Sequence, residues 1–598
     1  MYTLGINAAY HDDAACLVKD GVVIAAAEDE RFTHVKHGKR PVPFTTWQLP
    51  FHAIEYCLRE AGIEMKDVDH VAYSFRPELF AGSDARLDPL FLQYVNSAPR
   101  QLADGAPHHL TDRFGGLAHD GPYLWHYIEH HLAHEASAFL AAPFGESAVL
   151  TMDGRGEHVT TSYGEFRDGR YRRIKQVDLP HSLGLLYERV THYLGFLHSS
   201  DEYKVMALAS YGEPRFLDEF RRMVRVDDRG NYSVERADLE RVFGPARRRG
   251  GPMEQRHFDI AHSLQKVLEE TVLRMAAWLH RETGLADLCM AGGVALNCVM
   301  NARVRDEGPF ERVWVQPAAG DAGTALGAAL WVDWQERGRH GDPARRWSME
   351  HAFLGPGFED REIGEFLRWT GVPFRKLDDV AGEAAALLAE EKILGWFQGR
   401  MEFGPRALGG RSILASPLRP EMQARLNEIK DREDFRPVAP VVLEEAAHEW
   451  FTPHRSRDAG KDGFISKPGT DHIYQSAKSD AAADVSRYGN GGLSPVSGFP
   501  APFMLFVFDV RPDKAERIPA VRHVDGTARV QTINREQNPR YYDVIRAFGE
   551  RTGVPVLVNT SFNTRGEPIV CTPRDAVECF WTSPLDALVI GSYLLEKK

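Results

Sequence analysis

Two stretches of the chain, 3–28 and 148–179, follow the same plan, and this repeat restricts the possible folds more than any other feature. Each consists of an apolar strand, a polar turn, a second strand, a tight Asp-Gly turn and a third strand. The first strands end at Asn7 and Asp153, and the Asp-Gly turns at Asp20 and Asp168 follow 13 and 15 residues later. The sequence therefore predicts two copies of one hairpin-plus-strand unit.

Helical patterns fill the intervals between these strands, as in 260–280, where apolar residues recur at spacings of three and four. Repeated β units separated by helices are typical of a duplicated α/β fold of the actin, Hsp70 and sugar-kinase type (ASKHA). In that architecture, nucleotide phosphates bind between the two hairpin turns, where backbone N–H groups can receive anions. Chance similarity between two antiparallel meanders stays open at this point.

The 598-residue length favours several folding units. The helical pattern weakens after Ala328 and a new start follows near Glu350. We therefore expect an N-terminal domain over 1–345 and a C-terminal domain over 350–598. The segment 454–502 is rich in Gly, Ser, Asp and Pro. A long insertion of this kind predicts a functional lid.

Composition narrows the partners and the compartment. The chain has 72 Lys and Arg against 85 Asp and Glu, a net charge of -13, so we expect neither nucleic acid nor a membrane surface as partner. The 6 cysteines form no CxxC pair, and no run of about eighteen apolar residues occurs. These features predict a cytoplasmic protein whose ligands are small molecules. Both a monomer and a homodimer stay open at this point.

The segment HHLAH places His130 and His134 four residues apart, on one face of a helix, where both imidazoles can reach one metal ion. Asp153, at the end of a strand, and Asp321, in the Gly-rich turn QPAAGDAG, are candidate oxygen ligands. Two nitrogens and two oxygens suit iron, manganese or zinc. The alternative is a histidine pair that only fills an interface. Because HExxH is absent, a metalloprotease would lack its general base.

Glycine turns indicate where a nucleotide could bind. Gly292 and Gly293 join a strand to a helix that begins beyond Asn297, and Gly320 precedes Asp321 at another helix start. Neither turn has the Walker or dinucleotide spacing, and each alone is usually only a turn.

Cations gather around turns in the second half of the chain. They are Arg400, Arg406, Arg411, Lys430, Arg436, Arg529 and Arg565, the last beside Asn559, Ser561 and Asn563. One guanidinium group can donate two parallel hydrogen bonds to phosphate oxygens, so these residues predict an anion pocket. The alternative is a solvated face of surface ion pairs, since acidic residues are interspersed.

Taken together, these motifs resemble the O-carbamoyltransferases of the NodU/CmcH type. The resemblance runs almost end to end. It is carried by GINAAYHDDAACL, AAEDERFTHVKHG, HHLAHEASAF, TMDGRGE, KVMALASYGEP, AGGVALN and GDAGTALG in the first half, and by FGPRALGGRSILASP, FRPVAPVVLEE, HVDGTARVQT and NTSFNTRGEPIVCTP in the second.

The resemblance implies two domains with different tasks. The C-terminal domain, like the α+β protein YrdC, would form carbamoyl-adenylate from carbamoyl phosphate and ATP with Mg²⁺. The N-terminal domain, like the threonylcarbamoyl-transfer ATPase-fold protein, would pass the carbamoyl group to an acceptor hydroxyl near bound iron, most simply Fe²⁺.

The resemblance also implies roles for individual residues. The metal ligands fall on His130, His134, Asp153 and Asp321. His11, with Asp12 beside it, becomes a candidate base or positioning group, and His130, Asp153 and Arg529 complete the catalytic set. The nucleotide falls near Lys204, Gly292, Gly293, Asn297 and Gly320. The phosphate pocket falls on the second-half residues Arg406, Arg411, Lys430, Arg436, Arg529, Asn559, Ser561, Asn563 and Arg565. Ala207 departs from the glycine often found there in relatives.

We therefore expect an ATP-dependent O-carbamoyltransferase that modifies a hydroxyl of a natural product, as in antibiotic biosynthesis, or of a saccharide. The same fold could instead act as a kinase or a tRNA threonylcarbamoyl transferase, although the absence of a broad basic face argues against tRNA. A non-enzymatic, nucleotide-driven binding switch would leave both the metal ligands and the cations unexplained.

Overall fold

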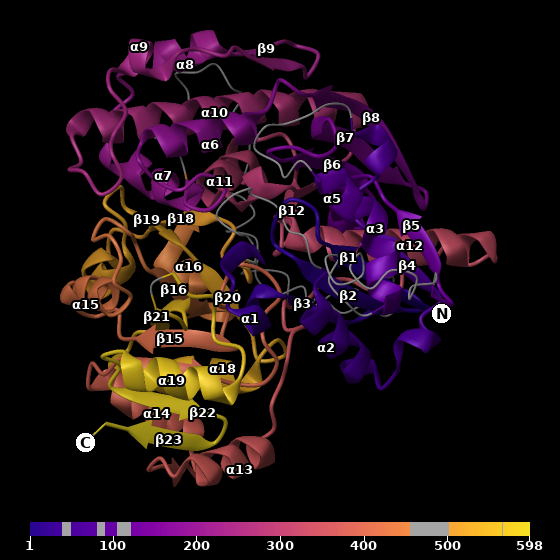
Figure 1. The fold of residues 1–598 in the computed structure, drawn as a ribbon. Coiled ribbons are helices and arrows are strands. Elements are labelled where there is room, and N and C mark those ends of the chain that lie inside the picture. The colour runs from indigo at the N-terminus through magenta and orange to yellow at the C-terminus, as the bar shows by residue number, and fades with distance from the viewer. Residues whose placement is uncertain (39–48, 81–89, 105–120, 455–500, 565, 598) are drawn as a thin grey trace, which may run out of the picture.

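The computed structural model describes residues 1–38, 49–80, 90–104, 121–454, 501–564 and 566–597 (Figure 1). Two sheets in the first half of the chain share one strand order. The first runs β3 (Val22–Glu28), β2 (Ala14–Lys19), β1 (Tyr2–Asn7), β4 (His70–Tyr73), β5 (Leu124–Tyr127). The second runs β8 (Arg170–Asp178), β7 (Val159–Arg167), β6 (Ser147–Met152), β11 (Asp287–Ala291), β12 (Arg312–Val315).

In both sheets the first three strands pair antiparallel and the last two add in parallel. The duplication predicted from the sequence is therefore confirmed by the strand order, and chance similarity of two meanders is excluded. Asp20 and Asp168 adopt positive φ angles of 48° and 50° at the hairpin turns, each followed by a glycine that does the same. This is the left-handed geometry that tight Asp-Gly turns provide.

Two helices, α5 (His130–Phe139) and α12 (Ala322–Arg339), pack against each other between the sheets (Figure 1). Their contact depends on glycine, because a Cβ atom on Gly327 would lie 1.8 Å from the carbonyl oxygen of Ala133. In the same way, a Cβ on Gly5 in β1 would lie 1.9 Å from the carbonyl oxygen of Ala325. The backbone of α12 can approach α5 and β1 this closely because Gly327 and Gly5 have no side chain.

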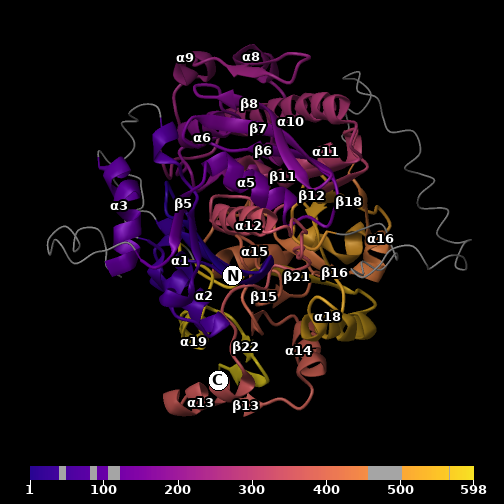
Figure 2. The ribbon, with the colours of Figure 1, turned by 90° about the vertical axis from the view of Figure 1, so that its right-hand side faces the viewer.

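The described part of the first half also contains α1 (Glu30–Thr33), α2 (Phe51–Ala61), α3 (Phe91–Asp104), α6 (Leu183–Tyr193), α7 (Glu202–Leu208), α10 (Gln255–Thr283) and α11 (Cys298–Glu307). Of these, α2 packs on β2 and β3, and α10 packs on β6. Between α7 and α10 the chain adds α8 (Leu217–Met223), the hairpin β9 (Val224–Val226) and β10 (Tyr232–Val234), and α9 (Leu239–Phe243). Figures 1 and 2 show α8 and α9 at one end of the molecule and α13 (Asp360–Thr370) at the other.

The second half is built on an 8-stranded mixed sheet. Its order is β13 (Arg375–Lys376), β23 (Tyr593–Glu596), β22 (Ala587–Ile590), β14 (Leu394–Phe397), β15 (Arg411–Ala415), β21 (Val556–Ser561), β16 (Ala439–Leu443), β20 (Gln531–Ile533). A 3-stranded sheet follows the order β17 (Phe451–Pro453), β18 (Val507–Val510), β19 (Thr527–Arg529). In the described part of this half, the helices are α13, α14 (Val380–Ala389), α15 (Glu421–Ile429), α16 (Ala447–Trp450), α18 (Pro539–Thr552) and α19 (Pro573–Thr582).

The two halves pack directly against each other. Arg31 Nη2 donates to the carbonyl oxygen of Gly404 at 3.1 Å, and Arg400 Nη2 donates to that of Ile24 at 3.1 Å. Lys204 Nζ lies 2.9 Å from Glu433 Oε1. One buried apolar core runs from one face of β2 and β3 through the second sheet into the C-terminal sheet, whereas the other face of the first sheet has a core of its own. A ligand held by one half can therefore lie close to residues of the other.

Within the described ranges, no helix is long and apolar enough to cross a membrane. All 6 cysteines are buried and unbridged. The predicted lid over 454–502 lies outside the described residues except at its two ends.

Candidate active site

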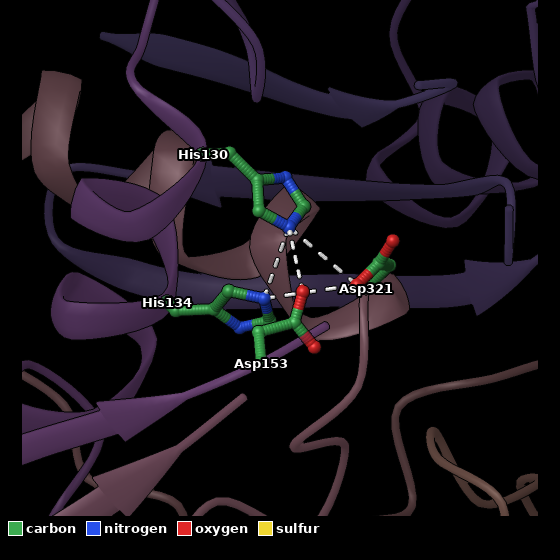
Figure 3. Close-up of side chains that lie close together, drawn as sticks. All are labelled: His130, His134, Asp153 and Asp321. Carbon is green, nitrogen blue, oxygen red and sulfur yellow. Dashed lines mark hydrogen bonds and ion pairs between the residues drawn. The ribbon is translucent and has the colours of Figure 1, made fainter. Parts of the chain in front are cut away.

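Four side chains from three separate elements converge at one point between the two sheets, and we call them the His/Asp cluster (Figure 3). His130 and His134 lie one turn apart on α5, Asp153 follows β6, and Asp321 is the N-cap residue of α12. The two Nε2 atoms are 3.2 Å apart. His130 Nε2 lies 3.6 Å from Asp153 Oδ2 and 3.5 Å from Asp321 Oδ1. The structure thus brings together all four predicted metal ligands.

The geometry of the His/Asp cluster fits a metal ion. Ligand atoms about 2.1 Å from a tetrahedral ion lie about 3.4 Å from one another, close to the separations seen here. All four side chains are buried, and Asp321 Oδ1 accepts no hydrogen bond within the described structure. A buried carboxylate oxygen without a donor is costly unless a cation compensates it. Two imidazoles and two carboxylates suit iron, manganese or zinc.

Neighbouring groups hold these ligands in position. His130 Nδ1 faces the carbonyl oxygen of Ser74 at 3.3 Å, so a proton on Nδ1 leaves the lone pair of Nε2 directed at the cluster. The backbone N–H of Gly293 donates to Asp153 Oδ1 at 2.9 Å. Gly292, with φ 89°, allows this approach, because a Cβ there would lie 2.1 Å from the carbonyl oxygen of Met152. The predicted Gly-Gly turn therefore orients a carboxylate of the cluster.

Charges within the cluster reinforce one another. Burial disfavours a charged imidazole, yet the carboxylates of Asp321 and Asp153 raise the pKa of His130 well above its ordinary value. Burial likewise disfavours ionised Asp153, but the hydrogen bond from His130 and the charge of His134 lower its pKa. The carboxylates therefore favour a positive charge at the centre of the cluster, on a proton or on a metal ion.

His11 lies at the edge of the same cluster. Its Nδ1 is 2.8 Å from Asp12 Oδ2 and 3.6 Å from Asp321 Oδ2. Asp12 also accepts from His37, whose Nδ1 lies 2.7 Å from Oδ1. Burial opposes ionisation of Asp12, but His37 and His11 lower its pKa well below the ordinary value. Asp12 thus fixes His11 through one oxygen while His37, which sequence analysis missed, holds the other.

A small pocket of about 80 Å³ opens beside the His/Asp cluster. Its lining includes Tyr10, His11, Asp153, Arg155, Leu185, Glu188, His198, Ser199 and Asp321. Glu188 Oε1 accepts from His198 Nδ1 at 2.9 Å and from the Ser199 hydroxyl at 2.7 Å. The pocket therefore presents carboxylate, imidazole and hydroxyl groups next to the candidate metal ligands.

Four arginines of the second half form a second site, which we call the cationic cluster: Arg406, Arg432, Arg436 and Arg529. Burial and the charge of Arg529 lower the pKa of Arg406 to about 9. Burial and the charge of Arg436 lower that of Arg432 to about 9. Nε of Arg406, Nη2 of Arg432 and Nε of Arg529 are buried and make no hydrogen bond in the described structure. Cations that repel each other around unpaired donors are suited to binding an anion.

Lys430 and its neighbours lie close to the cationic cluster. Lys430 Nζ donates to Ser561 Oγ at 3.2 Å and to Asn563 Oδ1 at 2.6 Å, so three predicted residues meet. Burial and the charges of Arg432 and Arg436 lower the pKa of Lys430 well below its ordinary value.

Other contacts bring Asn559 and the N-terminal half to the same region. Asn559 Nδ2 donates to the carbonyl oxygen of Ala407 at 3.0 Å, next to Arg406. The guanidinium of Arg436 lies 4.7 Å from the ring centre of Tyr203. The cationic cluster therefore faces the N-terminal half of the chain.

Several predicted residues have other surroundings. Arg411 is fully buried, and Nη1 and Nη2 donate to the carbonyl oxygens of Gln398 at 3.0 Å and Pro356 at 2.9 Å. Its guanidinium also stacks 3.6 Å from the ring centre of Phe397. Because backbone oxygens occupy its donors, Arg411 braces the sheet.

Of the predicted nucleotide contacts, Lys204 pairs with Glu433 as described above, and Asn297 caps α11 by accepting from the N–H of Met300 at 3.0 Å. A Cβ atom on Gly320 would lie 3.8 Å from Leu296 Cδ1, an ordinary contact, so this position does not require glycine. Arg565 lies outside the described residues. Arg432, which sequence analysis also missed, lies between Lys430 and Arg436 in KDREDFR, where adjacent acids conceal it.

Comparison with known families decides the class of this protein. The model "Carbamoyltransferase N-terminus" matches residues 2–114 and 118–330, and "Carbamoyltransferase C-terminus" matches 385–467 and 477–597. This chain belongs to the carbamoyltransferase family. It is therefore an enzyme that transfers carbamoyl groups, and the resemblance seen in the motifs is confirmed.

Curated relatives extend over nearly the whole chain. "Nodulation protein NolNO" of Sinorhizobium fredii is 39% identical over 99% of this chain and 80% of its own length. An uncharacterized protein of Synechocystis, sll1178, is 40% identical over 100% of this chain and 97% of its own. Among solved structures, HypF of T. kodakarensis is 13% identical, with a TM-score of 0.29, over 56% of this chain and 48% of its own.

Proposed function

We propose that this carbamoyltransferase uses ATP in two half-reactions, activating the carbamoyl group at the cationic cluster and transferring it at the His/Asp cluster. The observation that carries the proposal is the set of half-buried arginines, in which burial and repulsion between the charges lower the pKa of Arg406 and of Arg432. Such an arrangement is costly for the protein alone and is compensated by a polyphosphate. Carbamoyl phosphate and ATP with Mg²⁺ are the anions that the reaction would supply.

In the first half-reaction, carbamoyl phosphate reacts with water to give carbamate and phosphate. A carbamate oxygen then attacks the α-phosphorus of ATP. The bond between this phosphorus and the oxygen that bridges to the β-phosphorus breaks, and pyrophosphate leaves. The product is carbamoyl-adenylate. Arg406, Arg432 and Arg529 would neutralise the charge on the phosphates, with Lys430, Ser561 and Asn563 beside them.

In the second half-reaction, an acceptor hydroxyl attacks the carbamoyl carbon, and AMP leaves. Asp12 faces His11 Nδ1, so the tautomer with its proton on Nδ1 carries the lone pair on Nε2, which can accept the hydroxyl proton. Asp12, held in turn by His37, would stabilise the imidazolium that forms.

His130, His134, Asp153 and Asp321 would hold the metal, which we propose to be Fe²⁺. When bound, it would act as a Lewis acid that polarises an oxygen of the reacting groups.

The contact between the two halves supports transfer of the activated intermediate. Arg436 packs on Tyr203, and Lys204 pairs with Glu433, so residues of the N-terminal half border the cationic cluster. Burial between the halves would protect carbamoyl-adenylate from water. We assign transfer to a domain over 1–345 and activation to a YrdC-like domain over 350–598.

The acceptor we propose is a small hydroxylated molecule, either a natural product or a saccharide. We propose that the enzyme acts in the cytoplasm as a monomer or homodimer. The polar pocket beside the His/Asp cluster supports this choice, because Glu188, His198 and Ser199 can hydrogen-bond hydroxyl groups.

A panel of hydroxylated acceptors incubated with ATP, Mg²⁺ and carbamoyl phosphate tests the proposal. We expect AMP and pyrophosphate to form together and one acceptor to gain a carbamoyl group by mass. Carbamoylation that proceeds without ATP, or ADP as the nucleotide product, would contradict it.

A further inference from the structure

A second group of imidazole and carboxylate side chains lies at the other end of α12: His70, His126 and Glu336. His70 begins β4, His126 lies in β5, and Glu336 lies in the last turn of α12. His70 Nδ1 and His126 Nε2 are 3.0 Å apart, and one ligand atom from each of the three side chains lies within 4.8 Å of the others. Glu336 is 15 residues beyond Asp321. At 1.5 Å per residue, the two groups are about 22 Å apart along the helix.

The donor set of this group matches a known class of metal site. Two imidazole nitrogens and one glutamate oxygen are the ligands of open zinc sites, in which water takes the fourth position. His70 is buried, whereas His126 and Glu336 are partly exposed, so an ion and its water can enter from solvent. A hydrogen bond between the two histidines would explain their short contact but not the approach of the carboxylate.

The charges around the group are compatible with an ion. Arg339 Nη1 donates to Glu336 Oε1 at 2.5 Å. A carboxylate has two oxygens with several lone pairs, so Glu336 can contact an arginine and an ion together. Since both imidazoles are uncharged ligands, the carboxylate would compensate part of the charge of a divalent ion.

We propose that His70, His126 and Glu336 bind a second divalent cation, of the zinc class, that ties β5 to α12. β5 is an edge strand, hydrogen-bonded to β4. It ends at Tyr127, and α5 with His130 begins three residues later. α12 begins immediately after Asp321. The ion therefore braces α12 and the strand that leads into α5, without itself contacting the His/Asp cluster.

Zinc content after incubation with excess Zn²⁺ and gel filtration tests this site. We expect two zinc ions per wild-type chain and one in His126→Ala. In Glu336→Gln, which keeps the size of the side chain, we expect the second ion to bind at least about tenfold more weakly, since even outer-shell partners contribute about 10- to 100-fold. His340→Ala, an exposed histidine at the end of the same helix, is the matched control and should retain two ions.

The His130→Ala background separates this site from the His/Asp cluster. One zinc ion should remain in His130→Ala, and none in His130→Ala/His126→Ala. With Co²⁺ as the probe, the single variant should show the d–d absorption of a four-coordinate ion, and the double variant should lose it. A wild-type chain that holds only one ion, lost in His130→Ala, would overturn the second site and leave the first intact. Two ions in His126→Ala and in Glu336→Gln would overturn it as well.

Discussion

Replacing Arg406 with methionine should make the ligand-free protein more stable while abolishing its response to ATP. The pKa of Arg406 is about 9, against an ordinary value of about 12.5. At about 1.4 kcal/mol per pH unit, the difference corresponds to about 5 kcal/mol of unfavourable free energy for the charged form in the folded state. Water and salt screen most of this, and we take about 1–2 kcal/mol as the part that the substitution recovers.

The sign of the effect follows from the direction of the pKa change. A base whose pKa falls on folding costs stability at every pH below its folded-state pKa, so at pH 7 the full cost applies. Methionine keeps the apolar stem and removes the charge. For a unit of about 250 residues, 1–2 kcal/mol raises Tm by about 2–4 °C.

Differential scanning fluorimetry with and without ATP and Mg²⁺ measures both effects. In wild type we expect ATP to raise Tm, because it compensates the cationic cluster. In Arg406→Met the starting Tm should be higher and the ATP response absent. Arg419→Met is the matched control: its side chain is 67% exposed and pairs with Glu391, so both values should stay as in wild type. An Arg406→Met protein with a lower Tm would show that the charge of Arg406 does not destabilise the fold, and one with the full ATP response would show that Arg406 does not bind ATP.

Three further predictions concern the His/Asp cluster, the cationic cluster and the contact of α5 with α12. His134→Ala and Asp321→Asn should each remove bound metal, read by elemental analysis, because one of four ligands is lost; full occupancy in both would contradict the His/Asp cluster as a metal site. Arg529→Ala should lower the affinity for ATP by about one to two decades and slow pyrophosphate release; a wild-type rate would show that the anion pocket is misplaced. Gly327→Leu should destabilise the protein by more than about 2 kcal/mol in chemical unfolding, since the new Cβ overlaps the Ala133 carbonyl; an unchanged midpoint would mean that α5 and α12 can separate.

Much of the N-terminal fold could be predicted from the sequence because its signals are local. Asp-Gly turns and strand-length apolar runs determine each hairpin, and both occur twice at nearly equal spacing. The ligands His130 and His134 follow from helical periodicity alone. Asp153 and Asp321 could be proposed because each lies where a strand or turn ends, at positions that parallel strands bring to one edge of a sheet.

The parts that sequence analysis missed depend on contacts between distant segments. His37 lies 25 residues beyond Asp12 along the chain. The two side chains meet where the backbone of His37 takes a left-handed φ of 61°. Arg411 looks like an exposed cation in a Gly-rich turn, but the fold surrounds it with carbonyl oxygens. Arg432 lies among acidic neighbours in sequence, yet in the folded protein burial and the charges of Arg436 and Arg529 lower its pKa.

Measuring the two half-reactions separately tests whether activation and transfer occur at different sites. Carbamoyl-adenylate and carbamoylated acceptor are to be quantified by mass after rapid quenching, in wild type, His11→Ala and Arg529→Ala, with the acceptor found in the panel. We expect His11→Ala still to form carbamoyl-adenylate but to lose transfer by about 10²- to 10⁴-fold, whereas Arg529→Ala should form little adenylate. Unchanged transfer in His11→Ala, or loss of adenylate in His11→Ala as well, would contradict the assignment of activation and transfer to separate sites.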